Sequence, residues 1–189
     1  MKTKDFINIG VFAAIYFVLV FATGMLGIIN PPMMFVGYAL GIIANGVVIC
    51  LFKSRVPKLG SLAILGLIVG AAMMLTGHPW VVVLCAAILG LAGDFLFSQG
   101  SRICRILGYA IFSLWYVTPW FPVFVDAKGY YDYIVQSMGT AYADAMKWFL
   151  SPWMIVGWGG LVFLIGLIGG VFGNSILTRH FEKSGVAKS

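Results

Sequence analysis

The chain has 189 residues, of which 61% are hydrophobic, 15% aromatic and only 10% charged. Soluble domains carry about 25% charged residues, so this composition excludes an ordinary soluble enzyme or binding domain and indicates a membrane protein. The formal charge of +6 follows from where the basic residues fall along the chain and requires no nucleic acid partner.

Long apolar stretches predict an all-α polytopic membrane protein, with residues 1–189 forming a single domain of six transmembrane helices. Each stretch is about long enough, at ~1.5 Å per residue, to cross a hydrocarbon core of ~30 Å. Helices are favoured over barrel strands because the stretches lack two-residue alternation. The expected spans are Phe6–Leu26, Phe35–Phe52, Leu59–Thr76, Trp80–Phe97, Ile106–Val125 and Pro152–Leu177.

The basic residues predict the orientation in the cell membrane. If the N-terminus is cytoplasmic, ten of the twelve Lys and Arg residues fall in cytoplasmic segments, and only Lys128 and Lys147 lie outside. The positive-inside rule therefore predicts that both termini are cytoplasmic. We expect His180, in the basic C-terminal tail, to be solvated.

The stretch TGHPW at residues 76–80 is the expected outer turn between the third and fourth spans. Gly77 and Pro79 interrupt the helices, and Trp80 is suited to the membrane interface. His78 has two interpretations, a solvated loop residue or a side chain that faces a pocket open to the outside.

Aromatic residues gather in the outer half of the predicted bundle. They are typical of an interfacial belt or of helix packing, but together they also suit an apolar ligand pocket with a few polar groups. Ser113 and Thr118 are further candidate polar groups. The candidate substrate-binding residues are Asn30, Met34, Tyr38, His78, Trp80, Trp115, Tyr116, Trp120 and Trp158.

Residues 126–151 form the only long connection, and their apolar residues recur at three- and four-residue steps. This pattern predicts an amphipathic segment at the membrane surface between the fifth and sixth spans, divided at Gly139. The segment is either a passive interfacial helix or a lid over the outer pocket.

No catalytic constellation or phosphate-binding loop is found, so we expect no enzymatic activity and no resident cofactor. Cys50, Cys85 and Cys104 lack CxxC spacing and are expected to be apolar packing residues. Asp94, near the cytoplasmic end of the fourth span, is expected to form an ion pair with Arg102 or Arg105, with proton coupling as the alternative.

Several separated segments resemble one family, the Trep_Strep integral membrane proteins. They are KTKDFINIGVFAAIYFVLVF, LTGHPW, ILGLAGDFLF, LGYAIFSLW, YADAMKW and GLIGGVFGNSILTRHFEKSG. The resemblance covers nearly the whole chain and implies a substrate-binding S component of an energy-coupling factor (ECF) transporter. Such a subunit captures a micronutrient outside and works with a transmembrane coupling protein and two cytoplasmic ATPases. The alternative is a stand-alone ion-coupled carrier of a small solute.

The resemblance also implies a coupling-protein docking site of small residues on the first helix. Gly10, Ala13 and Ala14 match this pattern, with Gly10 where the family has alanine. The alternative is helix packing inside the monomer, which we also expect for the pairs Gly66 with Gly70 and Gly166 with Gly170.

The resemblance implies a vitamin-like substrate or a tetrapyrrole such as haem. His78 and the methionines at the outer helix ends, Met33, Met34, Met73 and Met74, are available as iron ligands only if the substrate is haem. No other metal site is expected.

Overall fold

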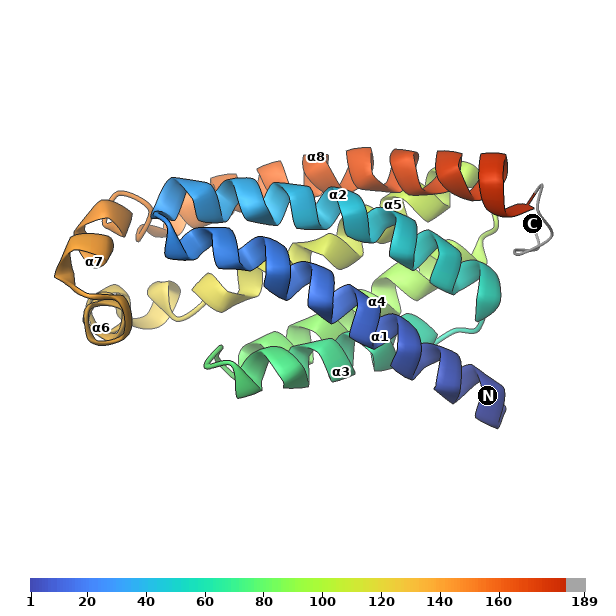
Figure 1. Ribbon diagram of the computed structural model, residues 1–189, viewed down its shortest axis with the longest axis horizontal. Helices are drawn as coiled ribbons and strands as arrows, with labels where there is room; N and C mark the ends of the chain where they lie inside the picture. Colours follow the sequence, from blue (N-terminus) through green and yellow to red (C-terminus); the bar gives the residue numbers. More distant parts are fainter. Residues whose placement is uncertain (183–189) are drawn as a thin grey trace.

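In a computed structural model, which describes residues 1–182 and the side chains as far as Arg179, the chain folds into a helical bundle (Figure 1). Its helices are α1 (Thr3–Gly24), α2 (Pro31–Arg55), α3 (Ser61–Leu75), α4 (Val81–Ser98), α5 (Arg102–Ser113), α6 (Val123–Met138), α7 (Thr140–Met146) and α8 (Pro152–Ile176). Two 3₁₀ segments, η1 (Met25–Ile28) and η2 (Leu114–Trp120), and the π-helical η3 (Leu177–Glu182) complete the described part. The prediction for the His180 side chain lies outside the described residues.

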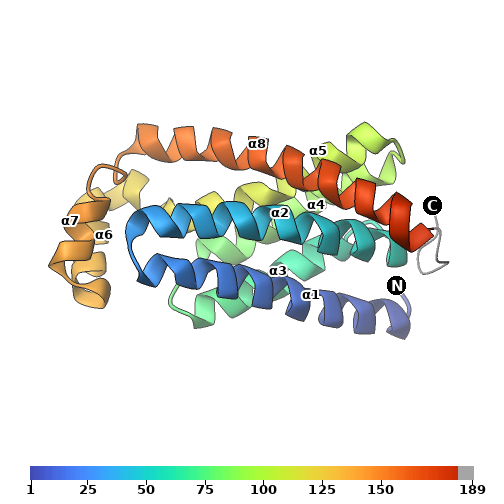
Figure 2. The same ribbon diagram turned by 45° about the horizontal axis from the view of Figure 1, so that its top comes forward.

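Six of these helices form a closed ring. Contacts link α1 to α2, α2 to α8, α8 to α5, α5 to α4, α4 to α3, and α3 back to α1. Figure 2 shows α1, α2 and α8 running side by side. Glycines permit the close approaches, since a Cβ on Gly66 would lie 2.4 Å from the Ala86 carbonyl oxygen and one on Gly166 would lie 2.8 Å from the Ala110 Cα. Gly70 and Gly170 are similarly tight, which confirms that both predicted pairs pack inside the monomer.

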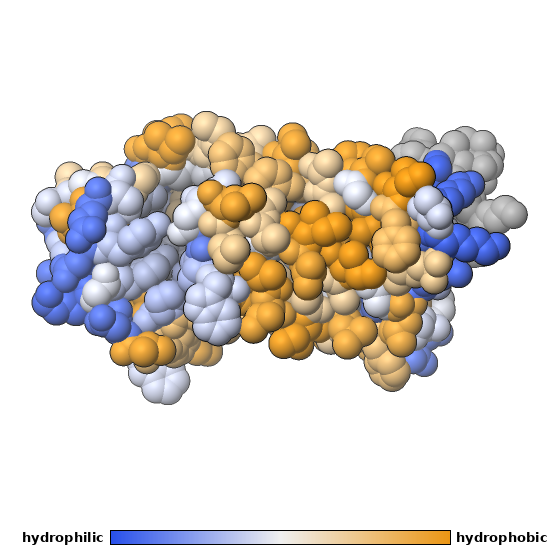
Figure 3. All heavy atoms as spheres, turned by 90° about the horizontal axis from the view of Figure 1, so that it is seen from below, coloured by the Kyte–Doolittle hydropathy of each residue, from blue (hydrophilic) through white to orange (hydrophobic). Residues whose placement is uncertain are grey.

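The apolar surface supports a membrane location. Figure 3 shows a hydrophobic band around the middle of the face in view, with hydrophilic residues at both ends. Among the described residues, four helices are long and apolar enough to cross a membrane, and a fifth candidate is the bent pair formed by Arg102–Trp120 and Val123–Met138. The helix in the predicted third span, α3, has only 15 residues. At ~1.5 Å per residue it is ~22 Å long, so six full-length spans are not confirmed.

The fifth predicted span, Ile106–Val125, differs most from the observed helix. The helix begins earlier, at Arg102, changes to 3₁₀ geometry at Leu114 and ends at Trp120, where the chain bends by 59° into α6. Pro119 explains the change, because proline has no N–H to donate and its ring crowds the carbonyl four residues earlier. The expected first outer loop is also mostly helical, as η1 and the start of α2.

The bundle has two different ends. The start of α1, the α2–α3 and α4–α5 connections and the end of α8 lie at one end, which we call the basic end (Figure 1). The other end carries the α3–α4 turn and the helices α6 and α7, which lie across the bundle. We call residues 123–151 the cap.

Candidate ligand site beneath the helical cap

A cluster of aromatic rings fills the bundle beneath the cap, and Phe35 in the first turns of α2 lies at its centre. The Phe35 ring lies 4.7 Å from Phe149 and 4.8 Å from Trp158, measured between centroids. Trp120 is stacked on Phe35 at 6.3 Å and meets Phe149 edge-on at 4.8 Å. We call Phe35, Trp120, Phe149 and Trp158 the aromatic cluster. Its rings come from α2, η2, α8 and the end of the cap.

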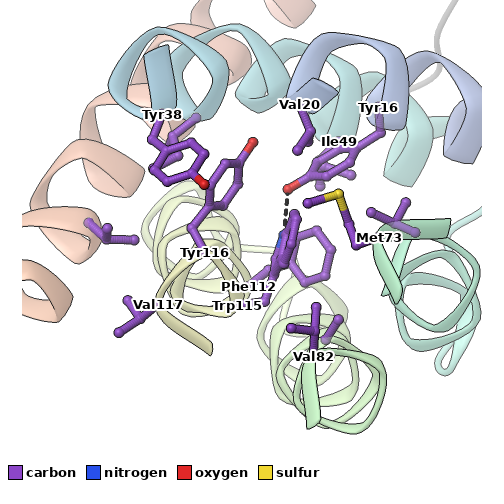
Figure 4. Packing of buried hydrophobic residues seen from close by; sticks show 14 of the residues in the cluster. Tyr16, Val20, Tyr38, Ile49, Met73, Val82, Phe112, Trp115, Tyr116 and Val117 are labelled. Atoms are coloured by element: carbon purple, nitrogen blue, oxygen red, sulfur yellow. Dashed lines mark hydrogen bonds between the residues drawn. The ribbon is translucent and has the colours of Figure 1, made fainter. Parts of the chain in front are cut away.

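A second row of rings continues from the aromatic cluster toward the middle of the bundle. Tyr38 lies 6.5 Å from Trp158 and 5.7 Å from Tyr116. Figure 4 shows Tyr38 beside Tyr116, and Trp115 turned toward Tyr16. The Trp115 indole N–H donates to the Tyr16 hydroxyl at 2.8 Å, so Trp115 is fixed as part of the core.

Three buried polar atoms in this region are unpaired. Among the described residues, the indole N–H groups of Trp120 and Trp158 have no acceptor, and the Asn45 side-chain oxygen has no donor. Trp120 is 5% exposed and Trp158 6% exposed, so solvent reaches neither indole freely. An unpaired buried donor costs about 1–3 kcal/mol, and most buried polar groups are therefore bonded. The two indoles are accordingly available to a ligand with hydrogen-bond acceptors.

Two breaks in helical geometry shape the cap. Asp126 has a non-helical conformation (φ −149°, ψ 83°) near the start of α6, and Gly139, at φ +88°, separates α6 from α7. The predicted division at Gly139 is thus confirmed. The Tyr131 hydroxyl donates to Asp144 at 2.7 Å and joins the two helices.

The cap contacts the bundle through a few groups. The Tyr133 hydroxyl donates to the Gly77 carbonyl in the α3–α4 turn at 3.1 Å. The Tyr130 ring meets Trp120 edge-on at 6.1 Å. Phe149, only 2% exposed, enters the aromatic cluster from the cap. Movement of the cap away from the bundle would therefore withdraw the Phe149 ring and open a space beside Phe35 and Trp120.

His78 is half-buried in the α3–α4 turn, beside the residue that Tyr133 contacts. Its Nδ1 lies 3.2 Å from the Met73 carbonyl oxygen and 3.1 Å from the Thr76 hydroxyl. A carbonyl can only accept, so Nδ1 carries the proton and Nε2 is left as the acceptor. Burial lowers the pKa of His78, although the bond to Met73 partly opposes this shift. His78 is therefore a neutral imidazole near pH 7.

Several predicted ligand residues have other roles. Asn30 is exposed and caps α2 by accepting from the Met33 N–H at 2.9 Å. Trp80 is 66% exposed and lines a separate surface groove with Phe124 and Val125. The hydroxyls of Ser113 and Thr118 donate to carbonyls of the preceding turn. These side chains do not join the aromatic cluster, because Asn30, Ser113 and Thr118 form local hydrogen bonds with the backbone and Trp80 faces the surface groove.

The remaining predicted ligand residues lie in or near the cluster. Trp120 and Trp158 belong to it, and Tyr38 and Tyr116 form the second row. Met34 is buried in the first turn of α2, with its sulfur 4.0 Å from the Tyr142 hydroxyl of the cap. The prediction missed Phe35 and Phe149. Phe149 was among the recurring apolar residues of the cap, but that pattern alone does not tell which of them reach the bundle core.

The small residues of α1 divide between two faces. Gly10 and Ala14 are exposed, and a Cβ on Gly10 would meet no atom within 4 Å in the described structure. Ala13 is 1% exposed and faces the core, so it is not part of an exposed docking surface. The reason is geometric, since adjacent positions on a helix lie ~100° apart. Packing inside the monomer does not explain Gly10 and Ala14.

Asp94 pairs with Lys53 rather than with Arg102 or Arg105. One Asp94 oxygen accepts from the Lys53 ammonium, and the other accepts from the Leu62 backbone N–H at 2.8 Å, at the start of α3. The sequence interpretation was wrong because Lys53, expected in the loop, lies buried in the last turn of α2. Arg105 instead donates to Asn174 at 3.0 Å.

Comparison with known proteins gives one match. A family model described as a hypothetical bacterial integral membrane protein (Trep_Strep) matches residues 3–183. Searches of curated proteins and of solved structures find no match. The family description agrees with the apolar helices and specifies neither a ligand nor a partner.

Proposed function

The chain belongs to the Trep_Strep family of bacterial integral membrane proteins, and from this premise we propose that it is the substrate-binding S component of an ECF transporter. In this proposal the six helices of the ring span the cell membrane and both termini are cytoplasmic. The cap then faces outward as an interfacial segment. The chain captures a micronutrient there and has no catalytic activity of its own.

The capped aromatic cluster is the observation that supports this proposal most. Withdrawal of the Phe149 ring with the cap would leave a slot bordered by Phe35 and Trp120, and its aromatic walls would suit a planar ligand. Buried Trp120 and Trp158 offer two N–H donors to that ligand. The described rings that border the slot carry no charge. The part of the ligand that enters the slot is therefore expected to be uncharged and aromatic.

The exposed strip of Gly10 and Ala14 supports association with a coupling protein. Small residues let a second helix approach until backbones touch, and here they face away from the chain's own bundle. Because the sequence has no phosphate-binding loop, we propose that two cytoplasmic ATPases bound to the coupling protein supply the energy. The exposed neighbours Val11 and Ile15 would add apolar area to the contact.

The contacts of Asp94 disfavour a stand-alone ion-coupled carrier. Both oxygens of this carboxylate have donors from α2 and α3. A proton-carrying carboxylate would need to exchange these bonds at each cycle. Asp94 is better suited to holding three helices together.

The proposal includes two ligand classes, a vitamin-like compound and a tetrapyrrole such as haem. His78 favours the second class, because it lies in the turn that the cap contacts and its Nε2 has no hydrogen-bond partner among the described residues. The absorption spectrum and native mass of protein purified from its own host distinguish the two. A Soret band that disappears in His78→Ala indicates haem, and a small colourless ligand indicates a vitamin.

The docking role is tested by Gly10→Leu in the reconstituted complex, with Gly160→Leu as the matched control. Both glycines are exposed and neither Cβ would meet an atom within 4 Å in the described structure, so both variants are expected to fold. We expect Gly10→Leu to lose the coupling protein on co-purification and to lose ATP-dependent uptake, while ligand binding is kept. Normal assembly and uptake by Gly10→Leu would falsify the docking role.

A further inference from the structure

A cavity of about 560 Å³ opens at the basic end, far from the aromatic cluster. It lies between the ends of α2, α4, α5 and α8, and its charged lining consists of Lys53, Arg55, Lys58, Arg105 and Asp94. Ligand sites in proteins commonly measure about 300–1,000 Å³, so this cavity has room for a small polar group. Its described lining has four cationic side chains and one carboxylate, an excess of three positive charges.

The buried Lys53–Asp94 ion pair neutralises one of the four cations and the one carboxylate in the described lining. Lys53 is bound to Asp94, to the Ser61 hydroxyl at 2.9 Å and to the Lys58 carbonyl at 3.1 Å. Lys58 makes only a loose contact with Asp5, at 3.9 Å. Of the ion pairs among the side chains that the structure describes, none involves Arg55 or Arg105. Their positive charge is therefore not neutralised within this part of the chain.

Arg105 is held in position by a buried amide. Its Nε donates to Asn174, which is 1% exposed and is itself fixed by donating to the Gly170 carbonyl at 2.9 Å. Its Nη1 donates to the Gly100 carbonyl at 3.3 Å. The guanidinium is thus oriented before any ligand arrives, which lowers the entropy lost on binding.

We propose that this cavity binds a phosphate group, with Arg55 and Arg105 as its principal ligands and Lys58 as a third cation. Guanidinium groups match phosphate oxygens in pairs, and a preoriented one favours phosphate over a spherical anion. The cavity lies at the basic end, and under the proposed membrane orientation this end is at the depth of lipid headgroups. Basic pockets between transmembrane helices at this depth bind anionic headgroups. The phosphate can belong to an anionic lipid or be free in solution.

Native mass spectrometry of protein extracted from bilayers tests the lipid source. The bilayers contain phosphatidylcholine alone or with phosphatidylglycerol, and the readout is the lipid retained per protein. The test variant is Arg55→Gln with Arg105→Gln, and the control is Arg102→Gln with Arg179→Gln. The control removes the same charge from exposed residues at the same end, outside the cavity lining.

We expect wild-type protein and control to retain phosphatidylglycerol and the test variant to bind it about 30-fold more weakly, the loss of two cations at ~1 kcal/mol each. A second measurement tests binding of free phosphate. The thermal midpoint of the protein in lipid-free detergent is compared in inorganic phosphate and in chloride at equal ionic strength. The site is assigned to free phosphate if phosphate raises the thermal midpoint of the wild type and the control, but not of the test variant, and no phosphatidylglycerol is retained.

Two results would overturn the proposal. One is equal retention of phosphatidylcholine and phosphatidylglycerol together with no effect of phosphate on the midpoint. The other is an equal loss of phosphatidylglycerol retention in the test variant and in the control, since this would show that the total positive charge of the basic end binds the lipid and the cavity does not. Arg55→Gln alone guards against misfolding, because Arg55 is exposed. It is expected to give about a fivefold loss, which corresponds to one cation at ~1 kcal/mol.

Discussion

At the scale of single residues, the unpaired indoles of Trp120 and Trp158 allow ligand binding to be tested separately from stability. Trp120→Phe and Trp158→Phe keep a ring and remove an N–H that has no acceptor in the described structure. We expect each to weaken ligand binding about 3- to 10-fold, the net value of one hydrogen bond. Equilibrium binding and thermal midpoints of the purified variants are the measurements.

Trp115→Phe is the control for these substitutions, because it makes the same change in ring volume. Its N–H is bonded to Tyr16, which is fully buried, so its loss leaves a hydroxyl unsatisfied at a cost of ~1–3 kcal/mol. Stability should therefore fall more in Trp115→Phe than in the other two. If all three variants lose stability alike and bind ligand normally, the indoles serve packing only.

His78 makes the stability of the protein depend on pH. Burial lowers its folded-state pKa below the ordinary value of about 6.5, so the unfolded chain binds the extra proton first as the pH falls. The contribution of His78 is complete above the unfolded-state pKa and is lost as the pH falls toward the folded-state value. Thermal midpoints of wild type and His78→Gln should converge or cross between about pH 7 and pH 5. A constant difference over this range would contradict the burial of His78.

At the scale of secondary-structure elements, the cap is the segment most able to move. It is joined to the bundle by the non-helical Asp126 on one side and by Ser151, the N-cap of α8, on the other. Tyr133 contributes one hydrogen bond to the α3–α4 turn. If the cap must open for ligand exchange, this bond resists opening.

Tyr133→Phe is therefore expected to speed ligand dissociation about 2- to 10-fold, as the loss of ~0.5–1.5 kcal/mol predicts. Tyr131→Phe is the control, since its hydroxyl bonds Asp144 within the cap and not the bundle. Stopped-flow dissociation of the bound ligand measures both. Equal rates in Tyr133→Phe and wild type would show that the cap does not control release.

Local signals predicted most helix ends correctly. The predicted helix start at Pro152 and the predicted division at Gly139 are confirmed, because proline fixes φ at a value suited to a helix start and glycine readily adopts the φ of +88° found at Gly139. By contrast, α2 begins at Pro31 and not at the predicted Phe35. The bend after Trp120 was missed, since its sequence is as apolar as a continuous span. An apolar run reports length and burial and does not report the direction of the chain.

The candidate site was only partly predictable for a related reason. Aromatic residues in the outer half indicated where a site would lie, and Trp120 and Trp158 are indeed part of it. Phe35 was missed although it marks the start of a predicted span, because its role depends on partners from η2, α8 and the cap. Such contacts join residues far apart in sequence, and one sequence without its fold does not specify them.

At the scale of the whole molecule, the basic end and the cap end are separate units of one bundle. Phe35 and Lys53 lie on the same helix, 18 positions apart, which is ~27 Å at the helical rise. The Lys53–Asp94 pair joins α2, α3 and α4 at the basic end, whereas the aromatic cluster joins α2, η2, α8 and the cap. A change at one end should therefore affect overall stability without altering the other site.

Asp94→Asn tests this separation and the structural role of Asp94 together. The amide keeps an acceptor for the Leu62 N–H but leaves the Lys53 ammonium, 7% exposed, without its counter-charge. Breaking one side of a buried pair costs about 3–5 kcal/mol, so the thermal midpoint should fall clearly. Lys53→Met in the same chain removes the unpaired charge and should restore most of that loss.

Ligand affinity at the cap end should stay within about twofold of wild type in both variants, because neither residue contacts the aromatic cluster. Loss of ligand-dependent transport in the doubly substituted, stable protein would instead indicate that Asp94 carries protons.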